Sequence, residues 1–286
     1  MSATFGGIHS RRALITWQTV FYIIMIAISV ATVVPFLFMA STSFTQSFTM
    51  MSYPPTLIPE DPSLTNYSEI IFRFQNGLFP RWFLNTALTT AAITLGSLFL
   101  NTLSGYIFAK KQFYGRDIVF ALMLSTMMVP RAVTLIPAFQ IVNILGLFNT
   151  YWALIIPGLS TAFGVFMMRQ FISSLPNELI EVAKIDGARE LRIFWSIVMP
   201  LSTPAMAALG IFTLINAWND FLWPLVVLRA NTMRTLVVGL ATVQSEFNIN
   251  YGLVMAGSVL TVLPLLVLYL LFQPYFVEGL RMGYGK

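Results

Sequence analysis

Six long apolar stretches dominate this chain and limit what it can fold into. A helix needs roughly 20 apolar residues to cross the hydrocarbon core of a bilayer. Lipid offers no partner to backbone N–H and C=O groups, and the apolar run FYIIMIAISVATVVPFLFMA does not alternate as a barrel strand would. We therefore expect an all-α, polytopic membrane protein with six transmembrane helices. The predicted spans are approximately 17–40, 85–109, 118–138, 151–171, 201–228 and 253–275.

Composition agrees with a membrane chain and excludes several classes of site. Only 9% of the residues are charged and 57% are hydrophobic, whereas soluble domains carry about 25% charged residues. The chain has no cysteine and a single histidine, His9 in the N-terminal tail. Disulfides, thiolate metal sites, a cysteine nucleophile and histidine-based metal clusters or triads are therefore excluded. We expect no metal site and no nucleic-acid partner, and we attribute the net charge of +5 to loops that set orientation.

The distribution of basic residues predicts the orientation in the membrane. Six spans place both termini on one side. If that side is the inner one, its segments hold eleven of the 16 Lys and Arg residues, and the outer segments hold five: Arg73, Arg81, Arg131, Arg229 and Arg234. Cytoplasmic loops carry an excess of Lys and Arg, so both termini are predicted to be cytoplasmic.

This orientation divides the chain into segments. We predict a cytoplasmic N-terminal tail (1–16), a transmembrane domain (17–275) that contains a cytoplasmic loop (172–200), and a cytoplasmic C-terminal tail (276–286). The first span is too long for the apolar region of a cleaved signal peptide, so we expect it to be retained. On the outer side, NYSEIIFRFQNGLFPRWFLN is expected to form an interfacial helix that leads into the second span.

The loop 172–200 carries the densest charge in the chain, and SSLPNELIEVAKIDGARE within it predicts a short helix. Ser174 is expected to cap it, Glu178 and Glu181 suit its positive end, and Gly187 stands where a left-handed C-terminal cap would fall. Leu179, Val182 and Ala183 are expected to form one apolar ridge. A second helix is expected from about Arg189, through LRIFWSIVMP, to Pro200 and the fifth span.

Two interpretations of this helix are open. An amphipathic helix that lies on lipid headgroups is usually rich in Lys and Arg on its polar face. Here four acidic residues offset three basic ones, Lys184, Arg189 and Arg192, so an anionic leaflet would gain little from it. The pattern favours docking into a groove on a protein partner over an interfacial position.

The loop resembles the EAA motif of ABC importer permeases. In EVAKIDGARELRIFWSIVMP the matching positions are Glu181, Ala183, Asp186, Gly187, Ala188, Ile197 and Pro200, with Val182 in place of the middle alanine. MMVPRAVTLIPAFQIVNILGLFNTYWALIIP, NAWNDFLWPLVVL, NTALTTAAITLGSLFLNTLSGYIFAKKQF and the tail QPYFVEGLRMGYGK are similar to stretches of the carbohydrate, maltose-type family. The family's usual Gly-Ala-Val-Lys ending is altered to Gly283-Tyr284-Gly285-Lys286. The resemblance covers about residues 15–286.

The resemblance implies a type I ABC importer permease fold in a bacterial or archaeal inner membrane. Its implied partners are a dimer of ABC ATPase subunits, a second permease subunit that the family pattern favours as a different chain, and an extracytoplasmic solute-binding protein. The loop 174–200 would be a coupling helix seated in a cleft on the ATPase. Glu178 and Glu181 would belong to this contact, Glu181 paired with a basic residue, and Gly187 would allow the turn between the two helices of the loop. The tail Gly283–Lys286 would also touch the ATPase pair.

Motifs for catalysis by this chain itself are absent from its sequence. A phosphate-binding loop needs G-x-x-x-x-G-K-[ST], and the only Gly-Lys pair, Gly285-Lys286, ends the chain. No Gly-x-Ser-x-Gly elbow occurs either. We therefore expect no enzyme activity and no cofactor in this chain, and we expect ATP and Mg²⁺ to be bound by partner ATPase subunits.

NAWNDFLWPL, at the end of the fifth span, supplies the candidate residues of a translocation path. Asp220 is the one acid placed in a span, and such residues usually face a bundle interior or a water-filled path. The alternative is that Asp220 is solvated or paired at the outer end of the span. Trp218, Asn219 and Trp223 suit sugar rings and hydroxyls, but a tryptophan near a span end is also a common interfacial anchor.

Three classes of function remain after this reading. The favoured one is a permease subunit that forms half of the path of a binding-protein-dependent importer for a sugar or oligosaccharide. A polyol or glycerol phosphate is the alternative solute, and the resemblance allows the other permease subunit to hold the solute. A stand-alone secondary transporter would show inverted repeats or several intramembrane ionisable groups, and a membrane enzyme would need catalytic groups. Neither pattern is found in the sequence.

Overall fold

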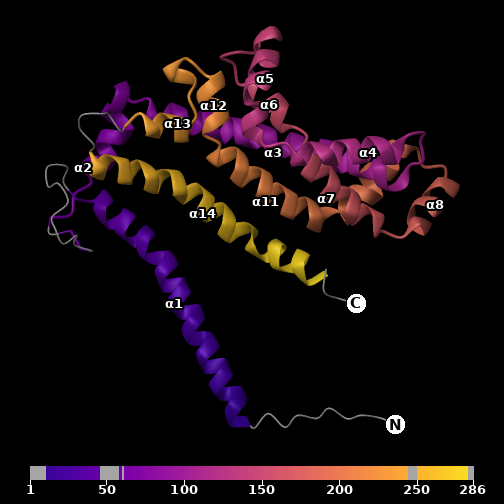
Figure 1. The fold of residues 1–286 in the computed structure, drawn as a ribbon, viewed down its shortest axis with the longest axis horizontal. Helices are drawn as coiled ribbons and strands as arrows, with labels where there is room; N and C mark the ends of the chain where they lie inside the picture. The colour runs from indigo at the N-terminus through magenta and orange to yellow at the C-terminus, as the bar shows by residue number, and fades with distance from the viewer. Residues whose placement is uncertain (1–10, 46–57, 60, 244–249, 283–286) are drawn as a thin grey trace.

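The computed structural model describes residues 11–45, 58–59, 61–243 and 250–282, and these residues form helices and connecting segments without a β-strand. The molecule is elongated, with α8 at one end and α2 and α13 toward the other (Figure 1). The helical elements in chain order are α1 (Arg11–Ser43), α2 (Thr65–Ser68), η1 (Glu69–Arg73), η2 (Phe74–Asn76), α3 (Phe79–Lys110), α4 (Arg116–Ser125), η3 (Thr126–Met128), α5 (Arg131–Ile144), α6 (Trp152–Gly158), α7 (Ala162–Ser173), α8 (Asn177–Ile185), α9 (Glu190–Ile193), η4 (Phe194–Val198), α10 (Met199–Leu201), α11 (Thr203–Asn219), α12 (Leu222–Val227), η5 (Asn231–Met233), α13 (Leu236–Ala241) and α14 (Tyr251–Met282).

Helix α3 is the central helix, and it packs along its length against α7 and α11. Small side chains let helix backbones approach closely in a membrane protein. At Gly105 a Cβ atom would lie 2.7 Å from the Cβ of Met168 and 2.9 Å from the backbone nitrogen of Arg169, so the contact between α3 and α7 requires glycine there. The buried polar face of α3 consists of Asn85, Thr86, Thr89, Thr90, Thr94, Ser97, Asn101 and Thr102.

Four helices in the described part of the chain are long and apolar enough to cross a membrane: Trp17–Ser43, Phe79–Lys110, Trp152–Ser173 and Tyr251–Leu271. Two bent helix pairs pass the same test, Arg116–Met128 with Arg131–Ile144 and Glu190–Leu201 with Thr203–Asn219. Each pair counted as one span gives six, which is the number that the sequence predicts.

The predicted span 118–138 is not one straight helix. Its two halves meet at an angle of 109°. Val129 and Pro130 are extended between them, with ψ angles of 119° and 136°. A proline lacks the N–H that would continue the helix and drives the residue before it toward extended geometry. The bend therefore follows from Pro130.

The predicted span 201–228 is also interrupted. Helix α11 ends at Asn219, Asp220 is extended with ψ 121°, and α12 starts as a separate helix at Leu222. The predicted span 253–275 is longer than expected, because α14 runs from Tyr251 to Met282 and takes in part of the predicted C-terminal tail.

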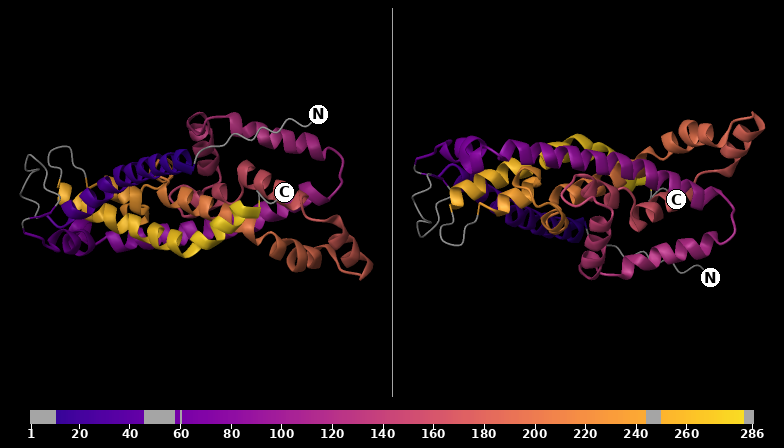
Figure 2. Two further views of the ribbon diagram at one scale, coloured as in Figure 1. Left: turned by 90° about the horizontal axis from the view of Figure 1, so that it is seen from below. Right: turned by 90° about the horizontal axis from the view of Figure 1, so that it is seen from above.

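The segment predicted as one interfacial helix consists of short pieces. A kink divides them, because Gln75 and Asn76 have φ angles of 45° and 60° and Gly77 follows with φ 73°. The pieces lie with α2 at the end of the molecule opposite α8 (Figure 1). Helix α3 starts at this end and runs toward α8 (Figures 1 and 2).

Helix α1 differs from the other long helices because it lies largely outside the bundle. None of its most apolar window is buried, and it diverges from the body after its contact with α14 (Figure 1). Its exposed side chains are almost all apolar, as a lipid-facing or subunit-facing helix requires.

Three apolar clusters hold the rest of the described chain together. The first joins the C-terminal parts of α3 and α7 to α8, α9 and η4, near the α8 end of the molecule. The second joins α3, α11, α13 and α14 around Trp82 and Trp218. The third packs α5, α6 and α12 around Ala153 and Val227. The first cluster supports the charged loop, and the third supports one wall of a cavity.

Candidate functional site

The charged loop forms the helix α8 that the sequence predicts, and its C-terminal cap is confirmed. Gly187 has a left-handed φ of 78°. Its N–H donates to the carbonyl of Lys184 at 3.0 Å, and the N–H of Ala188 donates to the carbonyl of Ala183 at 2.9 Å. This pair of hydrogen bonds is a Schellman motif, which satisfies two of the last carbonyls of the helix. Glycine stands at the position where a Cβ atom would cost conformational energy.

The predicted N-terminal cap is wrong. Ser174 ends the preceding helix α7, and its hydroxyl donates to the carbonyl of Phe171 at 2.7 Å. The residue that caps α8 is Pro176, in extended geometry with ψ 133° and without a side-chain hydrogen bond. Glu178 lies in the first turn and Lys184 in the last, so both charges complement the helix dipole.

The apolar ridge of α8 also differs from the prediction. Ala183 is half-buried and packs inward beside Ile180, which is buried against the cluster that includes Phe194 and Met168. Ile180 and Ala183 are three residues apart and therefore share the inner face. The outward ridge consists of Leu179, Val182 and Ile185, which are 44%, 57% and 83% exposed.

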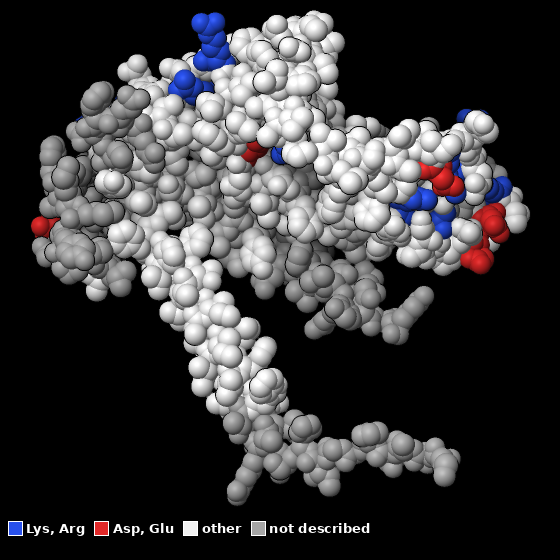
Figure 3. Space-filling view, viewed as in Figure 1, with Lys and Arg blue, Asp and Glu red and all other residues white. Residues whose placement is uncertain are grey.

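Acidic side chains accompany this outward ridge. Glu181 and Asp186 are exposed, and neither side chain forms a hydrogen bond or ion pair with any other described residue. The largest group of charged atoms on the visible face lies at this end of the molecule, where acidic and basic side chains are mixed (Figure 3).

The loop is tied to the end of α3 by a cluster of polar contacts. Glu190 accepts hydrogen bonds from Lys111 and, at 2.9 Å, from the Tyr106 hydroxyl, and Lys184 lies 3.8 Å away. Lys110 donates to the carbonyl of Leu175 at 2.6 Å and to Asn177 at 2.7 Å. These contacts fix one side of the loop to the end of α3. The acidic and apolar face of α8 is exposed on the other side.

Electrostatics favour the charged form of Glu190, which lies outside the predicted spans. The hydrogen bond from Lys111 lowers the pKa of the Glu190 carboxyl, against a smaller opposing effect of burial. The hydrogen bond from Tyr106 and the charge of Lys184 lower this pKa further. At neutral pH the carboxylate is therefore available as the acceptor that joins α9 to α3.

The remaining residues predicted in this loop lie along its return to the bundle. Ile197 is half-buried against the same cluster as Ile180. Pro200 lies in α10, immediately before the 77° bend into α11. Both residues thus belong to the base of the loop rather than to its outward face.

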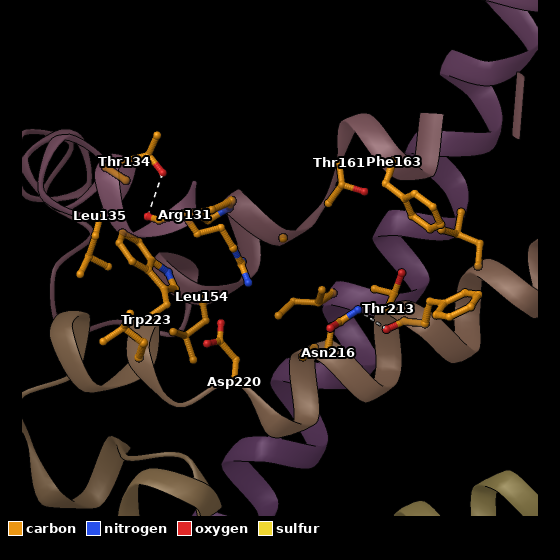
Figure 4. Close-up of a pocket in the computed structure, with 18 residues that line it drawn as sticks. Arg131, Thr134, Leu135, Leu154, Thr161, Phe163, Thr213, Asn216, Asp220 and Trp223 are labelled. Carbon is orange, nitrogen blue, oxygen red and sulfur yellow. Dashed lines mark hydrogen bonds between the residues drawn. The ribbon is translucent and has the colours of Figure 1, made fainter. Parts of the chain in front are cut away.

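A second site is a cavity of about 530 Å³ between α5, α6, α7, α11, α12 and the adjacent face of α3. Arg131 and Asp220 project into it from different segments of the chain (Figure 4). Arg131 is the first residue of α5, directly after the 109° bend, and Asp220 lies in the break between α11 and α12. The bend before Arg131 and the break at Asp220 were not predicted from the sequence. They place the two charged side chains at the cavity.

Polar and aromatic side chains continue the cavity wall away from these charges (Figure 4). Thr213 and Asn216 come from α11, and the Asn216 amide nitrogen donates to the carbonyl of Phe212 at 2.8 Å. Phe163 and Phe212 form an edge-to-face pair with centroids 6.0 Å apart. Trp223 also lines the cavity, and its indole N–H donates to the carbonyl of Ala153 at 2.9 Å.

The three residues predicted for a path separate in the structure. Asp220 lines the cavity, whereas Trp218 is only 4% exposed and packs in the cluster around Trp82. Its indole N–H donates to the carbonyl of Thr261 at 3.2 Å. Asn219 is exposed, does not line the cavity, and donates to the carbonyl of Ile215.

Sequence reasoning missed Arg131, Thr213 and Asn216 as cavity residues. Arg131 was counted among the outer basic residues that set orientation, yet it follows Pro130 inside an otherwise apolar stretch. A charge directly after a helix-breaking proline within a predicted span is the signal that marks it. Asn216 and Asp220 are four residues apart on one face of the same predicted span, which is a weaker signal of the same kind.

Comparison with known proteins places the chain among transport proteins. Residues 101–282 match the family model described as binding-protein-dependent transport system inner membrane component. An arabinooligosaccharide transport system permease protein of Halalkalibacterium halodurans is 41% identical over 252 residues, 88% of this chain and 90% of the relative. An sn-glycerol-3-phosphate transport system permease protein of Yersinia pestis is 36% identical over 235 residues, 79% of this chain and 83% of the relative.

A solved structure supports the fold independently. The structure is that of a bacterial ABC transporter involved in the import of the acidic polysaccharide alginate, and one of its chains superimposes with a TM-score of 0.83. The match covers 94% of this chain and 99% of that chain at 24% sequence identity. The all-α polytopic fold is thus shared with a chain of that transporter structure.

Proposed function

Since the chain belongs to the family of binding-protein-dependent transport system inner membrane components, we propose that it forms half of the translocation path of an ATP-driven importer for a sugar or oligosaccharide. The observation that carries this proposal is the loop of α8, which is fixed to α3 on one side and presents an unpaired acidic and apolar face on the other. A transport subunit that draws energy from a separate protein needs such a surface.

The outward face of α8 suits a groove on an ATPase subunit. Leu179, Val182 and Ile185 supply apolar area, and Glu181 and Asp186 supply charges for basic residues of the partner. Each exposed ion pair alone contributes about 0–1 kcal/mol. The apolar ridge therefore supplies affinity, and the acidic groups supply orientation.

Because the base of the loop is fixed to the bundle, a movement of the ATPase at this contact also moves the bundle helices. Ile180 and Ala183 pack on the cluster that includes α7 and η4, and Glu190 binds the end of α3. A force on α8 is thus passed to the helices that form the bundle. The chain has no phosphate-binding motif, so ATP and Mg²⁺ are bound by the ATPase subunits, and this chain is not an enzyme.

The transport cycle follows as alternating access. ATP brings two ATPase subunits together, and the coupling helices of two permease subunits follow them as rigid bodies. The path then opens toward an extracytoplasmic solute-binding protein, accepts the solute, and resets after hydrolysis. The second permease is a different chain in the arrangement that we favour.

A sugar or oligosaccharide is the favoured solute class. The arabinooligosaccharide permease of H. halodurans is more similar to this chain than the glycerol-phosphate permease of Y. pestis, at 41% against 36% identity. The amide, hydroxyl and aromatic groups of the cavity suit hydroxyls and sugar C–H faces. Glycerol phosphate or a polyol is the second candidate.

The basic residues set the proposed orientation. The α8 end of the molecule faces the cytoplasm, together with both termini, and the segments near α2 and α13 face outward. The chain is then a multi-pass protein of the cytoplasmic membrane of a bacterium or archaeon.

The function is tested by isolating the chain with its partners. Affinity purification from its native membrane is expected to recover a separate ATPase and a second permease. In liposomes the complex is expected to hydrolyse ATP faster when a solute-binding protein with its sugar is added. Uptake driven by an ion gradient, by this chain alone and without an ATPase, would instead identify a secondary transporter.

A further inference from the structure

We propose that this chain carries its own solute subsite in the cavity, built for a neutral polyhydroxylated solute, with Arg131 as a hydrogen-bond donor to the solute and Asp220 as the residue that selects against anions. The inference rests on the proposed function and adds the substrate class. It also departs from the arrangement in which the other permease subunit alone holds the solute.

The first observation is that the two charged side chains of the cavity are unpaired. Arg131 and Asp220 line one cavity, yet they form no ion pair with each other, and neither side chain bonds to another described residue. Arg131 is exposed where α5 begins, and Asp220 is half-buried just after the end of α11. Charged side chains beside membrane-spanning helices are costly unless they meet water, a partner or a ligand. Two opposite charges that face one cavity without neutralising each other fit a site that a polar solute enters.

The second observation is the unused hydrogen-bonding capacity between the charges and the aromatic pair. The Asn216 amide nitrogen is engaged with the Phe212 carbonyl, which leaves its carbonyl oxygen as an acceptor in the cavity. The Thr213 hydroxyl also lines the cavity without a hydrogen-bond partner among the described residues. Asp220 accepts, Arg131 donates, and Thr213 does both. Solute hydroxyl groups, which donate and accept, match this mixture.

The third observation is the apolar wall. Phe163 and Phe212 are 42% and 44% exposed, form an edge-to-face pair and line the same cavity as Thr213. The indole N–H of Trp223 is satisfied by Ala153, so this residue contributes apolar surface to the cavity. Small-molecule sites combine apolar and aromatic walls with a few placed polar groups in volumes of about 300–1,000 Å³. A cavity of about 530 Å³ lies within this range.

Charge balance decides the class of solute. The cavity holds one cation and one anion, so its net charge is zero. A phosphate monoester carries about −1.5 to −2 charges at neutral pH. Such a solute would gain from Arg131 and be repelled by Asp220, whereas a neutral saccharide uses both as hydrogen-bonding groups without a net electrostatic cost. The cavity therefore favours a neutral saccharide over glycerol phosphate.

The test measures solute binding to the purified complex of this chain with its native partner subunits, without the solute-binding protein. The probes are radiolabelled arabinotriose and maltotriose as neutral saccharides and sn-glycerol 3-phosphate as the anion. We expect a neutral trisaccharide to bind at least about tenfold more tightly than the anion. Asp220→Asn is expected to weaken trisaccharide binding and to narrow this preference by about tenfold. Arg131→Gln is expected to weaken the trisaccharide and to leave the anion weakly bound.

Matched variants distinguish a change in solute preference from a general loss of folded protein. Asp220→Glu keeps the charge and is expected to keep the preference. Asp61→Asn and Arg229→Gln make the same chemical changes at exposed positions outside the cavity and are expected to leave binding unchanged. Trisaccharide binding that is insensitive to both Asp220→Asn and Arg131→Gln, or tighter binding of the anion by the unmodified complex, would overturn the subsite.

The same preparations distinguish a failed subsite from a failed function. A complex that contains an ATPase and responds to a solute-binding protein, but whose solute binding ignores both cavity variants, overturns the subsite and leaves the importer assignment intact. A chain that purifies without any ATPase overturns the importer assignment itself.

Discussion

The loop of α8 and the cavity use charge in opposite ways. At the base of the loop, Glu190 is surrounded by Lys111, Lys184 and the Tyr106 hydroxyl, and these contacts hold one element against another. In the cavity, Arg131 and Asp220 face each other without an ion pair. Paired charges make a rigid joint, and unpaired charges leave room for a ligand. In the proposed function, the loop of α8 transmits force and the cavity contacts the solute.

The largest expected effect comes from a comparison of a tryptophan in the buried cluster with a tryptophan in the cavity wall. Trp218→Ala is expected to lower the free energy of unfolding by about 3–5 kcal/mol, because Trp218 is buried between α3, α11, α13 and α14. Trp223→Ala makes the same change at a half-buried cavity residue. Denaturant unfolding of the detergent-solubilised variants is expected to show the smaller loss for Trp223→Ala.

Solute binding is the second measurement that compares Trp218→Ala with Trp223→Ala. Trp218→Ala is expected to leave the ratio of neutral to anionic solute binding unchanged in the folded fraction, whereas Trp223→Ala is expected to alter it. An equal shift of this ratio in both variants would mean that the buried cluster around Trp82 belongs to the solute site, and the separation of core from cavity would be wrong.

The next effect tests the rigidity of the loop. Gly187→Pro removes the N–H that bonds to Lys184 and forces φ from 78° toward about −65°. The protein is expected to insert normally, while stimulated ATP hydrolysis and uptake fall by about 100-fold or to background. Both activities are measured in liposomes that contain the complete complex.

Gly146→Pro is the matched control for this variant. Gly146 also has a left-handed φ, of 69°, and its N–H donates to the carbonyl of Asn143 at 3.0 Å, but it lies after α5 and not in the loop of α8. Retained uptake in Gly187→Pro, or an equal loss in Gly146→Pro, would show that the turn after α8 has no special part in coupling.

A smaller effect is expected from reversal of one outward charge. Glu181→Lys leaves the packing of Ile180 and the contacts of Glu190 intact, because Glu181 is exposed and unpaired in the described chain. It replaces an attraction to the ATPase by a repulsion, so binding-protein-stimulated ATPase activity is expected to fall by about tenfold. Co-purification of the ATPase with the tagged chain is measured alongside.

Asp61→Lys provides the charge control for Glu181→Lys. Asp61 is exposed and precedes α2, which starts at Thr65 and lies at the end of the molecule opposite α8 (Figure 1). The same reversal of charge there is expected to leave co-purification of the ATPase with the tagged chain unchanged. Full stimulation in Glu181→Lys would exclude Glu181 from the contact and leave the apolar ridge as its main component.

The sequence predicts the loop better than the cavity because the signals of the loop are local. The Schellman cap depends on Gly187 and the residues just before it, and the acids of α8 share one short helix. The assignment of Ala183 to the outward ridge failed because Ala183 lies between Leu179 on the outer face and Ile180 on the inner face, and only the packing of Ile180 defines where the inner face is.

The cavity could not be predicted in the same way because its groups converge from distant parts of the chain. Arg131 and Asp220 are 89 positions apart in the sequence, and each was assigned to a straight span or to the edge of one. The breaks after Val129–Pro130 and at Asp220 aim the two side chains into one space. Pro130 predicts one break, whereas the position of the second depends on the packing of α12 against α6.

The smallest expected effect concerns Glu190 at the base of the loop. Replacement by Gln removes the charge that Lys111 and Lys184 neutralise, and since the pair is exposed the loss of stability is expected to be about 1 kcal/mol or less. The hydrogen bond from Lys111 lowers the pKa of Glu190 in the folded chain. The charge therefore contributes stability above the unfolded pKa of about 4.3, and this contribution is lost as the pH falls through the folded value.

Thermal unfolding of the solubilised chain at pH 7 and near pH 4 checks this expectation. Glu190→Gln is expected to unfold at a slightly lower temperature than the unmodified chain at pH 7, and the difference is expected to shrink at the lower pH. Glu181→Gln makes the same change in the same loop without an ion pair and is expected to show neither effect. A difference for Glu190→Gln that grows as the pH falls would mean that the carboxyl is held as the neutral acid. The joint between α9 and α3 would then depend on Ile180, Ile193 and the apolar cluster beneath the loop rather than on charge.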